Sequence, residues 1–313
     1  MTDHKGFLTN KPFILKSIVL LFSIGIGIML MSLILYLGGL IFFPGTDLLS
    51  PEVDVEKQLK NIDSTIFLQI CSQVFLMLVP AIIFGYFMRN NGFRYLKVDK
   101  LPGWKSLIIA FLIVFLGGIV TQTLVEVNRM IDIPDTLLGI DLSGLEERFD
   151  YYQELNEELM DGFFSIKDPM GILAVFVMIA IVPAISEEFL FRGVIQQLLI
   201  EGRHIVFTGI IVTAVTFGLI HFQFYNFFGL VFMGVVLGYL FYYSGNLWLP
   251  IIAHFLNNGL QVILVYLYEF NMIEVDIDEV EHIPYWISAI AFIGLIYFLK
   301  VLKKHKAAIE RLD

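Results

Sequence analysis

Eight long runs of apolar residues dominate this sequence, and they restrict its fold more than any other feature. They cover residues 17–43, 66–88, 104–125, 171–199, 205–222, 227–243, 248–268 and 283–302. Most match the ~20 residues that an α-helix needs to cross about 30 Å of hydrocarbon at 1.5 Å per residue. We therefore expect an all-α, polytopic membrane helix bundle with about eight transmembrane helices.

Composition supports this assignment and excludes several other classes of protein. Of 313 residues, 58% are hydrophobic and 16% are charged, whereas soluble domains carry roughly 25% charged residues. The net charge is −10 and the Lys and Arg residues are dispersed, so we expect no nucleic acid partner, because phosphate binding requires a basic face. The single cysteine, Cys71, cannot form an internal disulfide, and we expect it to pack as a small hydrophobic residue.

The distribution of Lys and Arg predicts the orientation in the membrane. An even number of crossings puts both termini on one side, and fifteen of the 20 basic residues fall on that side. By the positive-inside rule, both termini are then cytoplasmic, and we expect a multi-pass protein of the cell membrane. No A-x-A-like cleavage site closely follows the first run, so we interpret that run as a retained anchor.

Two acidic segments fall on the predicted extracytoplasmic side. Residues 126–169 carry twelve Asp and Glu, and residues 269–282 carry six with no Lys or Arg. Neither has the alternating acids and central glycine of an EF-hand, so we interpret them as a solvated rim, with a calcium site or a substrate-repelling collar as alternatives. We expect three regions: N-terminal helices plus the acidic segment (1–168), a helical core (169–268), and a last helix with a basic tail (269–313).

The fourth run contains Glu187 and Glu188 followed by Arg192. An ionisable side chain inside a membrane helix is unfavourable unless it is paired or faces a wet cavity, so each one marks a candidate site. Glu188 and Arg192 are four residues apart, in the order that favours a salt bridge, whereas Glu187 points about 100° away. We expect the pair to hold the helix and Glu187 to carry out chemistry. An internally satisfied triad without catalysis is the alternative.

The fifth run contains Phe217 and His221, again four residues apart on one helix face. Glu187 and His221 are equally far from residue 204, which lies in a polar turn. In an antiparallel hairpin such residues lie at the same depth and can meet. His221 could then exchange a proton or bind a metal, depending on its neighbouring carboxylate.

The third pair is His254 and Asn258, near the start of the seventh run. Their side chains can donate two hydrogen bonds to one developing oxyanion, and losing one such donor typically slows a reaction about 100-fold to 1000-fold. Asn257 lies about 100° off this face, and we interpret it as packing. For this pair alone, polar contact between helices is the alternative.

The depths of these residues agree only under one condition. Glu187 and His221 are each roughly 25 Å of helix from residue 204, whereas His254 is about 9 Å from Trp248 on the same side. We therefore expect the hairpin around residue 204 to project into the cytoplasm by about two or three turns. The site would then lie about a third of the way in from the cytoplasmic face.

Together the clusters read E-E-x-x-x-R, F-x-x-x-H and H-x-x-x-N, in this order and each on its own predicted helix. This pattern resembles that of the CAAX-protease and bacteriocin-processing family of intramembrane proteases, also called Abi, over about residues 171–268. The resemblance implies that Glu187 activates the attacking water together with His221. It also implies that His254 and Asn258 stabilise the oxyanion.

The same resemblance gives Glu188, Arg192 and Phe217 supporting roles. Eukaryotic relatives remove the last three residues of prenylated proteins, whereas many bacterial members have no assigned substrate. The resemblance therefore predicts the reaction more strongly than the substrate.

The sequence allows two versions of peptide hydrolysis. In the first, Glu187, His221 and His254 are the three protein ligands of an open Zn²⁺ site, and Glu188 or a rotated Glu187 acts as base. In the second, no metal binds and Glu187 is the general base in a low-dielectric cavity. The family is commonly labelled a metalloprotease, although the H-E-x-x-H zinc signature is absent from this sequence.

The sequence thus predicts an intramembrane endopeptidase that cleaves a membrane-embedded or lipid-anchored peptide, with prenylated CAAX-type substrates included, and that otherwise contacts membrane lipids. The main alternative is a non-catalytic immunity or scaffold protein that uses the polar cluster for stability. A proton-coupled transporter is a third option.

Overall fold

The computed structural model describes residues 6–46, 48–49, 61–131, 136–137, 140–141, 144–203, 205–274 and 283–309. These residues are almost entirely helical, which confirms the all-α prediction. The α-helices are α1 (Phe13–Ile41), α3 (Ile62–Gln73), α4 (Val79–Met88), α5 (Gly92–Tyr95), α6 (Trp104–Arg129), α7 (Leu145–Phe164), α8 (Pro169–Phe176), α9 (Val182–Leu190), α10 (Gln197–Arg203), α11 (Val206–Ile220), α12 (Phe227–Ser244), α13 (Trp248–Glu269) and α14 (Tyr285–Ile309).

Shorter elements connect these helices. Three π-helical segments, η1 (Val74–Leu78), η2 (Val177–Ile181) and η3 (Phe191–Gln196), lie inside longer rods, and the 3₁₀ turn η4 (Phe224–Asn226) joins α11 to α12. Strands β1 (Thr136–Leu137) and β2 (Ile140–Asp141) form a small antiparallel ladder before α7.

Within the described residues, seven rods are long and apolar enough to cross a membrane, in agreement with seven of the eight predicted runs. The remaining run forms α11, whose 15 residues extend only about 22 Å because the chain then turns back into α12. Large apolar side chains face outward from the bundle, such as Leu21, Phe115 and Ile293, which are 67%, 55% and 68% exposed. The chain is therefore a multi-pass membrane protein.

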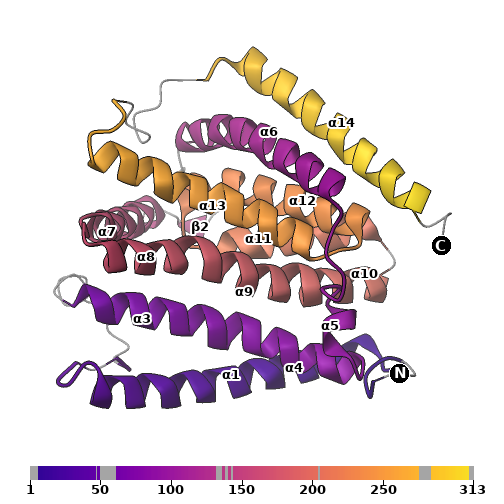
Figure 1. The fold of residues 1–313 in the computed structure, drawn as a ribbon, viewed down its shortest axis with the longest axis horizontal. Coiled ribbons are helices and arrows are strands. Elements are labelled where there is room, and N and C mark those ends of the chain that lie inside the picture. Colours follow the sequence, from indigo (N-terminus) through magenta and orange to yellow (C-terminus); the bar gives the residue numbers. More distant parts are fainter. Residues whose placement is uncertain are drawn as a thin grey trace.

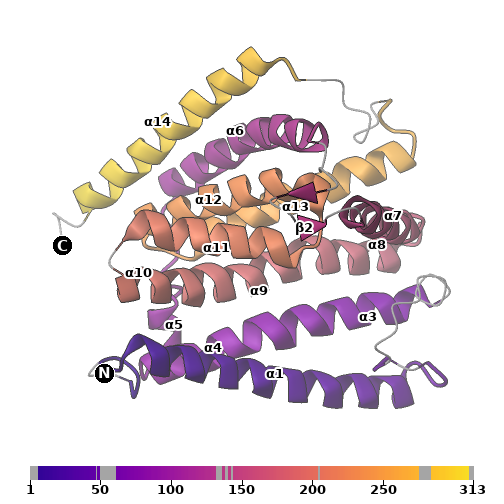
Figure 2. The ribbon, with the colours of Figure 1, turned by 180° about the vertical axis from the view of Figure 1, so that it is seen from behind.

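The rods run side by side, and both chain ends lie at one end of the bundle (Figure 1). Helix α7 lies across the opposite end and is seen nearly end-on from either side (Figures 1 and 2). We call these the terminal end and the α7 end. Within the described residues, the seven long rods and the shorter α11 make an even number of passes along the bundle, which explains why α1 begins and α14 ends at the same end.

A proline changes the hydrogen bonding of the central rod. The π segment η2 directly precedes α9, whose second residue is Pro183. Because proline has no N–H, the carbonyl of Ile179, four residues earlier, lacks an α-helical donor. Segment η1 precedes Pro80 in the same way. Such π segments are frequent at functional sites.

The hairpin that joins α10 to α11 extends beyond the start of α13, as the depths of Glu187, His221 and His254 require. A Cβ on Gly193 would lie 3.3 Å from Cδ2 of Leu247, which immediately precedes α13. The ten residues that follow Gly193, up to Arg203 at the end of α10, add about 15 Å of helix beyond the start of α13. The hairpin therefore projects past α13, and Glu187 comes level with His254.

The fold predicts which residues each side of the membrane exposes. In a Cys71→Ala background, Ser165→Cys, exposed at the α7 end, should react with a membrane-impermeant maleimide in intact cells. Lys100→Cys, exposed at the terminal end, should react only after permeabilisation. The reverse pattern would show that the Lys and Arg distribution does not set the orientation of this chain.

Candidate active site

Glu187 lies near the middle of the rod Pro169–Gly202 and is 3% exposed. Its Oε1 accepts a 3.1 Å hydrogen bond from Nε2 of Gln73, the last residue of α3. Its Oε2 is buried and has no hydrogen-bond donor among the described residues. A buried carboxylate oxygen without a partner is unfavourable, so it marks a place where a further group can bind.

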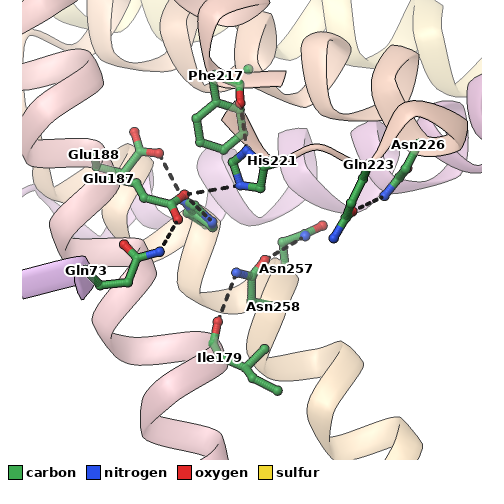
Figure 3. Close-up of polar contacts among 12 residues, drawn as sticks. Gln73, Ile179, Glu187, Glu188, Phe217, His221, Gln223, Asn226, Asn257 and Asn258 are labelled. Carbon is green, nitrogen blue, oxygen red and sulfur yellow. Dashed lines mark hydrogen bonds and ion pairs between the residues drawn. The ribbon is translucent and has the colours of Figure 1, made fainter. Parts of the chain in front are cut away.

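His221 follows the last residue of α11, and its ring faces Glu187 (Figure 3). Its Nδ1 lies 2.6 Å from the carbonyl oxygen of Phe217. Because a carbonyl oxygen only accepts, Nδ1 carries the proton, and Nε2 presents a lone pair when the ring is neutral. That Nε2 lies 4.0 Å from Oε2 of Glu187.

His254 approaches the same carboxylate oxygen from α13. Its Nδ1 lies 3.0 Å from Oε1 of Glu188, so this carboxylate fixes the orientation of the ring. Its Nε2 lies 3.8 Å from Oε2 of Glu187. Glu188 therefore does more than hold its own helix, since it also positions an imidazole on another one.

The two Nε2 atoms and Oε2 of Glu187 converge on one small space. Separations of 3.8 and 4.0 Å exceed the ~3.2 Å limit of a direct hydrogen bond. A water molecule or an ion between the groups suits this spacing. Glu187, His221 and His254 all line one cavity of ≈ 440 Å³. The structure thus brings together the acid and both imidazoles that the sequence singled out.

Glu188 and Arg192 form the predicted ion pair. Nη1 of Arg192 lies 2.6 Å from Oε1 of Glu188, and neither side chain is exposed to solvent. The second guanidinium nitrogen donates to the carbonyl of Gly234 on α12 at 3.1 Å. The guanidinium also lies over the ring of Phe217, 5.0 Å from its centroid. The pair therefore joins the central rod to α11 and α12.

Asn258 reaches the cavity, but its amide already has partners (Figure 3). Its Nδ2 donates to the carbonyl of Ile179, which Pro183 leaves without a donor, at 3.2 Å. Its Oδ1 accepts from Asn257 at 3.1 Å. One of its two amide hydrogens is left for another acceptor. Asn257 also lines the cavity, so its interpretation as packing is wrong: the cavity is wider than one face of α13.

Carboxamides outside the three motifs complete the cavity wall. Gln73 contacts Glu187 directly. The other amide side chains that line the cavity are Gln69, Gln122, Gln223, Asn226 and Gln261. Gln69 and Gln73 are four residues apart in a predominantly apolar run. This is the spacing of the three motif pairs, and it is the signal that could have identified them.

The donor types of Glu187, His221 and His254 suit Zn²⁺, which binds two imidazoles and one carboxylate in several catalytic sites. Both imidazoles are oriented through Nδ1, as is usual for metal-binding histidines. In the described part of the chain, no three His, Cys, Asp or Glu side chains are close enough to hold an ion as they stand. Tetrahedral ligands lie about 3.4 Å apart, so zinc would require the groups to move closer by a few tenths of an ångström.

Comparison with known proteins identifies one segment of the chain. Residues 169–260 match the family model described as type II CAAX prenyl endopeptidase Rce1-like. The match includes all three motif clusters, which confirms the resemblance expected from them. No curated protein and no solved structure matches the chain. Helix α3, which supplies Gln73, lies outside the matched segment.

The buried ion pair makes a prediction about stability. Glu188→Ala should lower the free energy of unfolding by about 3–5 kcal/mol, because it leaves the Arg192 guanidinium buried without its counter-charge. The matched control, Glu269→Ala, breaks a 2.6 Å pair with Lys167 in which the side chains are 39% and 42% exposed. Its loss should be about 0–1 kcal/mol. Unfolding in mixed detergent micelles measures both, and equally small losses would contradict a structural role for the buried pair.

Proposed function

We propose that this chain, whose residues 169–260 match the type II CAAX prenyl endopeptidase Rce1-like family model, hydrolyses a peptide bond in a membrane-embedded or lipid-anchored substrate. The observation that carries the proposal is the convergence of Oε2 of Glu187 with two imidazole Nε2 atoms on one cavity. A buried carboxylate oxygen without a hydrogen-bond donor destabilises the bundle, so packing alone does not explain why Oε2 of Glu187 lies there. The proposed location is the cell membrane, with lipids as its other contacts.

Glu187 is the general base of the proposed reaction. A water molecule between Oε2 of Glu187 and Nε2 of His221 gives a proton to the carboxylate while its oxygen attacks the scissile carbonyl carbon. The carbonyl electron pair moves onto its oxygen and forms a tetrahedral oxyanion. When this intermediate collapses, the C–N bond breaks and the proton on Glu187 passes to the leaving amine. The products are a carboxylic acid and an amine.

His254 and Asn258 stabilise the oxyanion. Nδ1 of His254 donates to the carboxylate of Glu188, so Nε2 donates to the oxyanion in the form of the ring that carries both protons. The amide hydrogen of Asn258 that Ile179 does not use is the second donor. Both donors are fixed before the substrate binds, which is what makes such groups effective.

Zn²⁺ held by Glu187, His221 and His254 would supply Lewis-acid polarisation of the scissile carbonyl and a more acidic water. The contacts of the two Nδ1 atoms orient the rings equally well for this form. Glu188 would keep His254 and Arg192 as its partners.

Substitution of the three central residues tests the proposal. Glu187→Gln, His221→Ala and His254→Ala should each slow cleavage about 100-fold to 10,000-fold, the usual contribution of a positioned acid or base. The assay is fluorescence release from an internally quenched farnesylated peptide with a C-terminal Cys-aliphatic-aliphatic-X sequence, in proteoliposomes, with a non-prenylated transmembrane peptide as second probe. Because Gln is nearly isosteric with Glu, Glu187→Gln also controls for folding. Biological activity retained in all three variants would favour an immunity or scaffold role.

Gln73 makes a separate prediction, since it donates to the catalytic carboxylate from outside the family segment. Gln73→Leu should lower kcat about 10-fold to 100-fold, corresponding to the ~1.5–3 kcal/mol of a hydrogen bond to a charged group. Gln69→Leu removes an amide from the same cavity one turn away and should lower kcat less. Equal losses would mean that Gln73 acts only through the polarity of the cavity.

Metal removal distinguishes the two versions of the mechanism. Spacings of 3.8 and 4.0 Å suit a bridging water, so we expect turnover to survive a strong chelator and purified protein to contain less than one zinc per chain. Elemental analysis and activity after dialysis measure these outcomes. Loss of turnover that added Zn²⁺ restores would instead assign the zinc mechanism.

A further inference from the structure

We infer that the substrate peptide reaches Glu187 from the α7 end of the bundle, through a mouth that α7 partly covers. The inference rests on the proposed function for the identity of the occupant. The access route itself comes from the position of the cavity. Along the central rod, α13 and α6, the lining residues lie level with the catalytic cluster or nearer the α7 end, and on α12 they begin near that end at Gly229.

The central rod shows this distribution most clearly. It runs from the α7 end at Pro169 to the terminal end, and its lining residues are Met178, Ile179, Pro183 and Glu187. None of the described residues 188–202 takes part.

Helix α13 runs in the opposite direction and gives the same result. It starts at the terminal end, yet its lining residues begin at His254 and continue toward the α7 end with Asn257, Asn258 and Gln261. On α6, the lining residues fall in the part of the helix that approaches the α7 end, and they are Gly118, Thr121 and Gln122. These three rods thus place their parts of the cavity wall in the half of the bundle nearer the α7 end, whereas α12 extends the wall toward the terminal end as far as Leu237.

The other half is filled by packed side chains. A contiguous apolar core occupies the terminal end, and each of its buried members is at most 6% exposed: Leu8, Ala81, Phe84, Met88, Leu96, Phe189, Leu190, Val194, Phe241, Leu247 and Ile251. The buried Glu188–Arg192 pair lies next to this core. A peptide arriving from the terminal end would have to displace close-packed groups, which is strongly unfavourable.

Helix α7 spans the mouth of the cavity. Near its start, the ring of Phe149 stacks on Phe224 in the turn between α11 and α12, with centroids 3.7 Å apart. Near its end, the carbonyl of Phe163 accepts a 3.3 Å hydrogen bond from the hydroxyl of Tyr266 on α13. Between these anchors, Met160 contributes to the cavity wall. The amphipathic, acidic helix α7 thus lies across the opening of the cavity and covers part of it.

The wall of the cavity suits an extended peptide backbone. Eight carboxamide side chains line it, and the described lining residues include no Lys or Arg: Gln69, Gln73, Gln122, Gln223, Asn226, Asn257, Asn258 and Gln261. Each carboxamide both donates and accepts hydrogen bonds, as does each peptide unit of an extended chain. A peptide segment unfolded to reach Glu187 therefore finds partners for its main chain.

This geometry changes one expectation from the sequence. The catalytic cluster is closer to the terminal end of α13, as predicted, but its cavity opens toward the other end. With the orientation predicted from Lys and Arg, the α7 end is extracytoplasmic. The cleaved segment would then come from the extracytoplasmic side.

Cysteine accessibility tests the route without requiring a known substrate or catalysis. In the Cys71→Ala background, Thr121→Cys and Asn257→Cys place thiols on two walls of the cavity. In the described part of the chain, the hydroxyl of Thr121 has no hydrogen-bond partner, so Thr121→Cys removes no observed bond. Asn257→Cys serves as the second probe. A small, charged methanethiosulfonate reagent is applied to either side of sealed membrane vesicles. Ser165→Cys and Lys100→Cys mark the α7 and terminal sides.

We expect the thiols of Thr121→Cys and Asn257→Cys to react when the reagent is on the Ser165 side, and to remain unmodified when it is on the Lys100 side. Reaction from the Lys100 side, or no reaction from either side, would overturn the inference. Since labelling does not depend on turnover, this outcome is separate from that of the Glu187→Gln assay. If the cavity thiols are labelled from the Ser165 side but the protein cleaves no peptide, the proposed function is wrong and the access route is supported.

Discussion

The ion pair between Glu188 and Arg192 is the interaction on which the rest of the site depends. In an interior of low dielectric constant, neither charge is stable without the other. Arg192 also donates to the carbonyl of Gly234 on α12, and Glu188 also accepts from His254 on α13. The pair therefore fixes the relative positions of three rods. Because Glu187 is the next residue on the helix and turned by about 100°, this fixed frame aims its carboxylate into the cavity.

The N-terminal part of the chain contributes to the site as well as to the bundle. Gln73 reaches Glu187 from the end of α3, beside a π-helical segment and outside the segment that matches the family. The acidic segment, which the sequence indicated as a solvated rim, contains a helix anchored across the cavity mouth. The polar cluster of the segment that matches the family model is thus completed by elements outside that segment.

The sequence predicted what local periodicity determines, and it missed what depends on distances between helices. Apolar runs located seven rods, and four-residue spacing correctly paired Glu188 with Arg192 and separated them from Glu187. It could not show that α11 is short, because that length depends on where the chain turns back. Gln73 was missed although it lies four residues after Gln69, and Asn257 could not be assigned to the cavity, because the width of a cavity depends on how rods pack.

The proposed mechanism requires Glu187 and His221 to act as one unit on one water molecule. A double-mutant cycle measures this most directly, by comparing cleavage by Glu187→Gln, His221→Ala and the double variant. If both hold the same water, the second substitution should add little to the first, as is found for residues that act together. Losses in activation free energy that add within about 0.3–0.5 kcal/mol would mean that the two residues act independently, which would contradict the claim.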